Sequence, residues 1–134
     1  MQDHGADWPK LVWLLDARDE RHLVSIATLP APPVDAFMHQ GGRFGAHNLH
    51  ENPPVPGAWR SEDVVLGTFF NAGVRAYDVR DPYSPREIAH FVPPAPAGSP
   101  VGAAQLNDVF VDDRGIVFTV DRHAGGLYVL EMNL

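Results

Sequence analysis

The sequence contains no cysteine, which excludes disulfide bonds, thiolate metal ligands and cysteine nucleophiles. It also has no apolar run close to the roughly 20 residues that a membrane-spanning helix needs. Basic residues are in the minority, because ten lysines and arginines accompany seventeen aspartates and glutamates and leave a net charge of −7. Nucleic-acid binding requires a basic surface that displaces counterions from phosphates, so we expect no nucleic-acid partner.

Signals for targeting and for catalysis are also missing. The N-terminal stretch MQDHGADWPK is polar and acidic, unlike a secretory signal, and this favours a cytoplasmic location. The chain has no glycine-rich phosphate loop and no GxSxG nucleophile elbow. No strong catalytic motif therefore identifies the chain as an enzyme, and its activity has to be sought in individual side chains.

What the sequence does contain is typical of a single all-β domain. Its 134 residues include 45% apolar residues, 13 prolines and 12 glycines, a composition that predicts many turns around one core. Apolar runs of strand length recur between turn-rich segments. They cover residues 10–17, 22–29, 63–70, 74–79, 86–92, 106–111, 116–121 and 127–132, and a short further strand is expected within 44–51.

Two of these segments have a specific interpretation. Residues 10–29 contain no glycine or proline, so one continuous helix competes with a hairpin there, but Val, Ile and Thr in 22–29 favour strands. Residues 63–70 are almost continuously apolar, as expected for a strand that is covered on both faces.

The C-terminal half repeats one plan. VVLGTFFNAGVRAYDVRD and GIVFTVDRHAGGLYVLEMN each contain an apolar strand, a short glycine-containing turn and a second strand. HNLHE (47–51) precedes the first copy and NDVFVDD (107–113) precedes the second. A repeat of about 40–60 residues with several strands per unit indicates propeller blades.

The segment 67–91, GTFFNAGVRAYDVRDPYSPREIAHF, resembles the LVIVD-repeat family of β-propellers. Residues 107–131 resemble the front half of the same repeat, and 14–19 resemble its back half, with Glu20 where the proline would be. The features that agree in 67–91 are Gly73, Asp78, Val79, Asp81, Pro82 and Pro85.

This resemblance implies a partial propeller of four-stranded antiparallel blades, about two to three in number, within one domain spanning 1–134. The expected units are a half blade (10–29), a full blade (44–92) and most of a blade (104–132). Since propellers need four to eight blades, the remaining blades are expected from a longer chain or from other copies. The family is also similar in architecture to selenium-binding, methanethiol-oxidase-like propellers, which use histidine-bound metal, but no motif here carries a ligand over.

Asp16 and Arg18 have the same spacing as Asp78 and Arg80, which raises the question of a catalytic pair used twice. We interpret them as scaffold. A carboxylate at the end of a strand accepts hydrogen bonds from the N–H groups of the following turn. The two arginines are expected to face solvent or to pair with a neighbouring blade.

Polar residues at the ends of the expected strands are candidates for a ligand-facing ring at the mouth of a propeller channel. His47 and Asn48 occupy places similar to those of Asn107 and Asp108, and arginine at such a mouth could hold an anion. The alternative is ordinary turn chemistry. The candidate ligand-binding residues are Asn48, Asn71, Arg75, Asn107, Asp108, Asp121 and Arg122.

A transition-metal site is the other candidate. On a strand, His47 shares a face with Glu51, and His123 in a turn could approach His47 across adjacent blades. Two histidines and a carboxylate suit zinc, iron or copper. Two functions follow. One is a binding or scaffold module of unknown ligand. The other is a metal-dependent enzyme, such as an oxidoreductase, that loses its metal on His47→Ala or His123→Ala.

Overall fold

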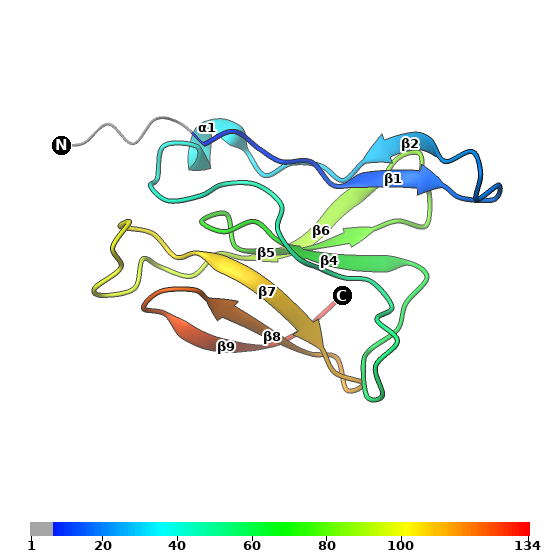
Figure 1. The fold of residues 1–134 in the computed structure, drawn as a ribbon. Coiled ribbons are helices and arrows are strands. Elements are labelled where there is room, and N and C mark those ends of the chain that lie inside the picture. The colour runs from blue at the N-terminus through cyan, green and yellow to red at the C-terminus, as the bar shows by residue number, and fades with distance from the viewer. Residues whose placement is uncertain (1–6) are drawn as a thin grey trace.

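The computed structural model describes residues 7–134, which form three antiparallel β-sheets stacked as layers (Figure 1). The sheets have two, four and three strands in chain order, so the all-β, antiparallel prediction is confirmed. Residues 10–29 form a hairpin rather than a helix. The elements are β1 (Trp13–Asp16), β2 (Val24–Thr28), α1 (Val34–Phe37), β3 (Leu49–His50), β4 (Val64–Thr68), β5 (Val74–Asp78), β6 (Arg86–Phe91), β7 (Leu106–Val111), β8 (Ile116–Asp121) and β9 (Gly126–Glu131).

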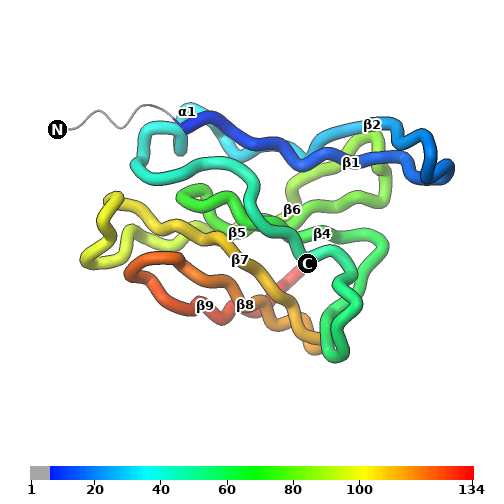
Figure 2. The backbone as a smooth tube through the Cα atoms, in the orientation of Figure 1, coloured from blue at the N-terminus to red at the C-terminus, as the bar shows by residue number. Residues whose placement is uncertain are grey.

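Each sheet is a simple meander in which neighbours in sequence are neighbours in space. The backbone tube shows the layers following one another along the chain, with β1–β2 and α1 on one side, β3–β6 in the middle and β7–β9 on the other side (Figure 2). Among residues 7–134, no helix reaches the length and apolarity that crossing a bilayer requires.

The middle sheet is covered on both faces. Its central strands carry apolar side chains on each face, and each face packs against a different neighbouring sheet. Leu66, Val74 and Ala76 belong to a core shared with the third sheet. Phe69 and Tyr77 belong to a core shared with the first sheet and α1. Since side chains alternate across a strand, this division matches the alternation along β4 and β5.

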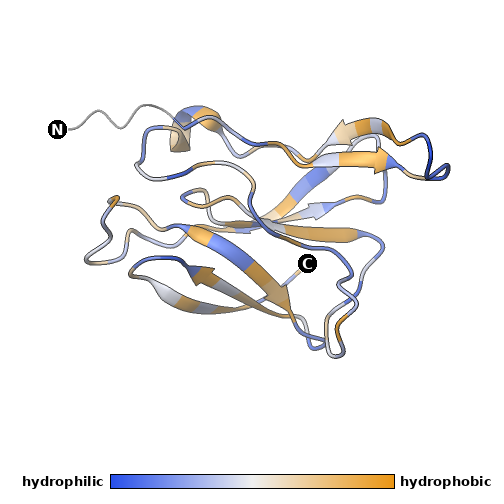
Figure 3. Cartoon of the chain, in the orientation of Figure 1, coloured by the Kyte–Doolittle hydropathy of each residue, from blue (hydrophilic) through white to orange (hydrophobic). Residues whose placement is uncertain are grey.

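The two cores account for the stacking of the three layers. Figure 3 shows apolar residues along the strands and polar residues in the turn that joins β1 to β2. The core between the second and third sheets contains Leu66, Val74, Ala76, Leu106, Val109, Val111 and Val117. The core between the first and second sheets contains Leu29, Phe44, Phe69, Ala72 and Tyr77.

The β4–β5 turn is tight and depends on one glycine. The N–H of Ala72 donates to the carbonyl of Phe69 at 2.9 Å, and the N–H of Gly73 donates to that of Phe70 at 3.1 Å. Gly73 has φ of 81°, and a Cβ atom there would lie 2.1 Å from the carbonyl oxygen of Phe91. Only glycine fits this position without a shift of the backbone.

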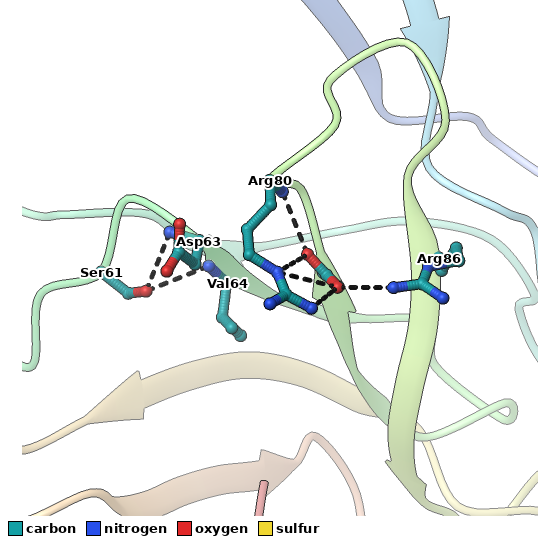
Figure 4. A network of polar contacts seen from close by, with 6 residues as sticks. Ser61, Asp63, Val64, Arg80 and Arg86 are labelled. Carbon is teal, nitrogen blue, oxygen red and sulfur yellow. Dashed lines mark hydrogen bonds and ion pairs between the residues drawn. The ribbon is translucent and has the colours of Figure 1, made fainter.

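The β5–β6 turn is held by the carboxylate of Asp78, the last residue of β5. Its Oδ1 accepts the backbone N–H of Arg80 at 3.0 Å, as the sequence predicts. Figure 4 shows the side chains of Arg80 and Arg86 converging on this carboxylate, with Nη2 to Oδ2 distances of 2.6 and 2.9 Å. Hydrogen bonds from Arg80 hold the pKa of Asp78 far below its ordinary value.

The same turn recurs in the other two sheets. Asp16 accepts the backbone N–H of Arg18 at 3.0 Å, and Asp112 accepts that of Arg114 at 3.0 Å. Each arginine folds back onto its own aspartate, with Nη2–Oδ2 distances of 2.5 Å. The predicted bonds from turn N–H groups to Asp16 and Asp78 are confirmed. Of the two alternatives for the arginines, exposure to solvent agrees with the structure, because the side chains of Arg18 and Arg80 are 86% and 65% exposed.

Candidate functional site

The candidate residues gather at the end of the sheets opposite to the Asp-x-Arg turns. In alternating antiparallel strands, the starts of β3 and β7 lie at the same end as the β4–β5 and β8–β9 turns (Figure 1). The loop 39–46, which follows α1, also reaches this end (Figure 1). Five chain segments therefore contribute side chains to one region.

The structure brings together the two polar pairs that the sequence places in equivalent positions. Nδ1 of His47 lies 2.6 Å from the carbonyl oxygen of Asn107. The side-chain amide of Asn48 donates to Oδ1 of Asp108 at 3.1 Å. These bonds cross from the second sheet to the third, so the first strands of the two sheets are joined at this end.

Phe70 forms the centre of the region, and sequence analysis missed it. Its ring centroid lies 5.8 Å from the guanidinium carbon of Arg43 and 5.6 Å from that of Arg122. The imidazole of His47 packs against the same ring edge-on, with centroids 4.8 Å apart. Cations within about 6 Å of an aromatic centroid are attracted by its quadrupole. Phe70 lies in an apolar run in the sequence, where it reads as a core residue.

A hollow of about 370 Å³ opens beside this ring. Oδ1 of Asp7 is bound by the ammonium group of Lys10, and Oδ2 accepts the N–H of Phe44 at 2.7 Å. Burial raises the pKa of Asp7, but these contacts outweigh it and the pKa is lowered. The lining residues are Asp7, Lys10, Arg43, Ala46, His47 and Phe70.

Asp121, a predicted ligand residue, instead holds its own turn. Its carboxylate accepts the backbone N–H groups of His123 at 2.8 Å and Gly125 at 3.1 Å, and that of Gln105 at 2.5 Å. Burial raises the pKa of Asp121, but the backbone donors lower it below its ordinary value. The carboxylate therefore fixes the β8–β9 turn, which presents Arg122.

Asn71 and Arg75 are directed into the fold rather than toward a ligand. Both residues are about 3% exposed. The amide of Asn71 donates to the carbonyls of Phe37 and Gly41 at 2.9 and 3.1 Å. The guanidinium of Arg75 contacts both carboxylate oxygens of Glu87 at 2.8 Å. These two residues hold loops and strands in place, which corrects their assignment to a ligand-facing ring.

The predicted metal site is not assembled. Nδ1 of His47 is occupied by a backbone carbonyl, and no hydrogen bond in the described chain joins it to Glu51 or His123. Nor do any three His, Asp or Glu side chains within residues 7–134 come together in an arrangement that could hold a metal ion. The geometry of this end is that of donors around an aromatic ring.

A larger hollow of about 470 Å³ lies between β5, β6 and β9, but it offers little for recognition. Its lining is mostly apolar, and it includes Leu66, Phe91 and Met132. Its polar lining residues are Arg75, His90, Glu131 and Asn133, and the first two of these are bonded to Glu87. This hollow continues the core where the second and third sheets diverge.

Comparisons with known protein families, curated proteins and solved structures found no match to this chain. The interpretation of its function therefore depends on the geometry of the end that carries Phe70.

Proposed function

We propose that this chain is a non-catalytic binding module built from consecutive blades of a β-propeller with LVIVD-like repeats, and that its ligand binds at the Phe70 end of the sheets. The two-, four- and three-stranded sheets have the strand numbers expected for a half blade, a full blade and most of a blade. Each sheet is a meander, as propeller blades are.

Hydrogen bonds join the segment that leads into β3, the first strand of the second sheet, to β7, the first strand of the third sheet, and they give the main support for this proposal. His47 bonds to Asn107 and Asn48 bonds to Asp108, so the segment just before β3 is joined to the beginning of β7, and these are the strands that would line a channel. Contacts between corresponding positions of successive units are typical of repeat architectures, in which each unit buries its face against the next.

The outer faces of the stack support the same arrangement. Trp13 and Leu15 are exposed on β1, and Leu127 and Val129 are exposed on β9, with exposed fractions between 49% and 60%. Successive blades cover such faces in a propeller. The proposal places further blades, from a longer chain or from other copies, against both.

Binding is favoured over catalysis by the state of the polar groups. The carboxylate of Asp121 is saturated by backbone donors, and that of Asp108 accepts from Asn48 and from the N–H of Val109. The groups left facing the hollow are mainly donors. A metal-dependent enzyme would need His47, Glu51 and His123 to converge, and the described geometry does not provide this.

The test is a set of nuclear magnetic resonance titrations of the ¹⁵N-labelled protein with small anionic, cationic and neutral compounds. Saturable shifts of the amides at 43–47, 69–73 and 121–123 are expected, with the compounds unchanged after incubation. Shifts confined to the Asp-x-Arg turns at 16–19, 78–81 and 112–115 would contradict the proposed location. Conversion of a compound would contradict a purely binding role.

A further inference from the structure

The backbone at Phe70 is held in a conformation that phenylalanine seldom adopts. Its φ is 49°, in the left-handed region, where a bulky side chain is strained. Its N–H donates to the carbonyl of Leu106 at 2.9 Å, and its own carbonyl accepts from Leu106 at 3.2 Å. It also bridges to Phe44, so two segments lock it in place. Strain of this kind persists where the surroundings fix it, and it concentrates at functional sites.

Two arginines and a histidine pack on this ring, and they come from separate segments. Arg43 lies on the loop after α1, His47 just before β3 and Arg122 on the β8–β9 turn. Within residues 7–134, neither guanidinium has an ion-pair partner. The arginines at 18, 75, 80, 86 and 114 are all paired, although the protein has an excess of carboxylates.

The hydrogen bonding of His47 fixes which of its nitrogens faces a ligand. A carbonyl can only accept, so Nδ1 carries the proton that it donates to Asn107. Nε2 has no hydrogen-bond partner in the described chain. An imidazole protonated at both nitrogens would keep the bond to Asn107 and present a second donor to an anion.

The hollow beside the ring has the size and charge for a small organic anion. Its volume of about 370 Å³ falls in the range of small-molecule pockets. Asp7 and Lys10 neutralise one another, which leaves Arg43 as the unmatched charge of the lining. Arg122 reaches the same ring from the next sheet, although it is not part of the lining of the hollow. Phe70 itself is only 3% exposed, so its ring supports the two arginines and His47 from beneath.

We propose that this hollow binds a small oxyanion, a carboxylate or phosphate group, between Arg43, Arg122 and Nε2 of His47. The inference rests on the proposed function, since it names the ligand class of the same end of the sheets. A guanidinium matches the paired oxygens of either group with parallel N–H donors. Stacking on Phe70 holds both guanidinium groups in place before the ligand arrives, which reduces the ordering that binding requires.

The experiment is calorimetric titration of the purified protein with inorganic phosphate and with succinate at constant ionic strength. Saturable binding is expected for at least one, and Arg43→Gln and Arg122→Gln are each expected to raise Kd about tenfold or more, the loss of a charge-assisted hydrogen bond. Arg60→Gln is the matched control, because Arg60 is an exposed arginine on the β3–β4 loop at the other end. The Kd of the Arg60→Gln variant for the anion should be unchanged.

Three results would overturn the inference: no saturable binding of either probe, an equal loss of affinity in Arg60→Gln, or full affinity in both Arg43→Gln and Arg122→Gln. Succinate binding without phosphate binding would assign the site to carboxylates, and the reverse would assign it to phosphates. Failure of both anions, with amide shifts at 43–47 and 69–73 caused by a neutral compound, would reject the anion and retain the binding module. Absence of any shift there would reject both.

Discussion

The backbone N–H of Val111 donates to Nδ1 of His50 across 3.1 Å, which joins the first strand of the third sheet to the first strand of the second. Because Nδ1 accepts, the proton of the neutral imidazole is on Nε2, which lies 2.9 Å from the carbonyl oxygen of Trp59. His50 is only 2% exposed, so both bonds are shielded from water. The ring therefore acts as a buried clamp between two layers.

Replacing His50 by alanine is expected to destabilise the protein by about 2–4 kcal/mol, because a buried N–H and a carbonyl lose their partner and a cavity remains. Urea unfolding followed by tryptophan fluorescence measures this change. His47→Ala is the control. His47 is exposed and makes one side-chain hydrogen bond, so its removal should cost less than about 1 kcal/mol. Equal costs for the two variants would show that His50 is not a clamp.

Much of the layered architecture follows from local sequence patterns. The runs at 106–111 and 116–121 coincide with β7 and β8, because alternating apolar residues end at a DDRG turn. Residues 63–70 are almost continuously apolar, and β4 is indeed packed between two cores. The spacing of Asp78 and Arg80 indicated a strand-ending turn, since a carboxylate reaches the N–H two residues later.

The candidate site was only partly predictable, because it depends on contacts between distant segments. His47 and Arg122 were identified as polar residues at strand ends, but Phe70 reads as one more residue of an apolar strand. Arg43 lies in a glycine-rich loop whose path is set by packing against Gln105, 62 positions away. Arg75 looked available in sequence, but its partner Glu87 is on the neighbouring strand. Pairings of this kind appear only when the sheets are assembled.

Asp78→Asn tests the strand-ending turn through its dependence on pH. The pKa of Asp78 is lower in the folded than in the unfolded chain, so the folded state binds fewer protons. The stabilisation is complete above the unfolded pKa, near pH 4, and is lost as the pH falls below it. The variant should be less stable at pH 7, and its free energy of unfolding should decline less between pH 5 and 2. Parallel declines would contradict this role.

Asp16→Asn offers a matched comparison in the same motif. Asp16 contacts Arg18 alone among the arginines, whereas Asp78 contacts both Arg80 and Arg86. Its side chain is also more exposed, at 20% against 7% for Asp78. We expect the same direction of change with a smaller effect, measured in the same series of unfolding curves. A larger effect at Asp16 would show that the second arginine adds nothing.

Removing one partner of the ion pair between Arg75 and Glu87 is expected to destabilise the protein, mainly because the other partner keeps its charge without this counter-ion. Arg75→Met leaves the partly exposed carboxylate of Glu87 with His90 as its remaining side-chain partner. It should cost about 2–3 kcal/mol, below the range for fully buried pairs, because solvent screens Glu87. The double variant Arg75→Met/Glu87→Gln should cost less than the sum of the single changes, with a coupling of about 1 kcal/mol. Strict additivity in urea unfolding would show that the two side chains do not stabilise one another.

Strand β9 is an edge of the third sheet, and we expect the protein to associate with itself through this edge. Leu127 and Val129 are 59% and 57% exposed and lie on the same face of a strand that has no neighbour on one side among the described residues. An apolar edge strand promotes pairing with another chain, and a lysine there opposes it. We expect the molar mass of the purified protein, measured by light scattering on a sizing column, to rise with concentration. Val129→Lys should weaken this rise.

The matched control is Val55→Lys, because Val55 is 49% exposed and lies in the β3–β4 loop, outside every strand. Val55→Lys adds the same charge as Val129→Lys. The comparison therefore distinguishes an effect of blocking the β9 edge from an effect of charge on solubility in general. Association that persists in Val129→Lys would place the contact on another face, of which the exposed face of β1 with Trp13 and Leu15 is the next to test. A protein that stays monomeric at every concentration would contradict the expected association.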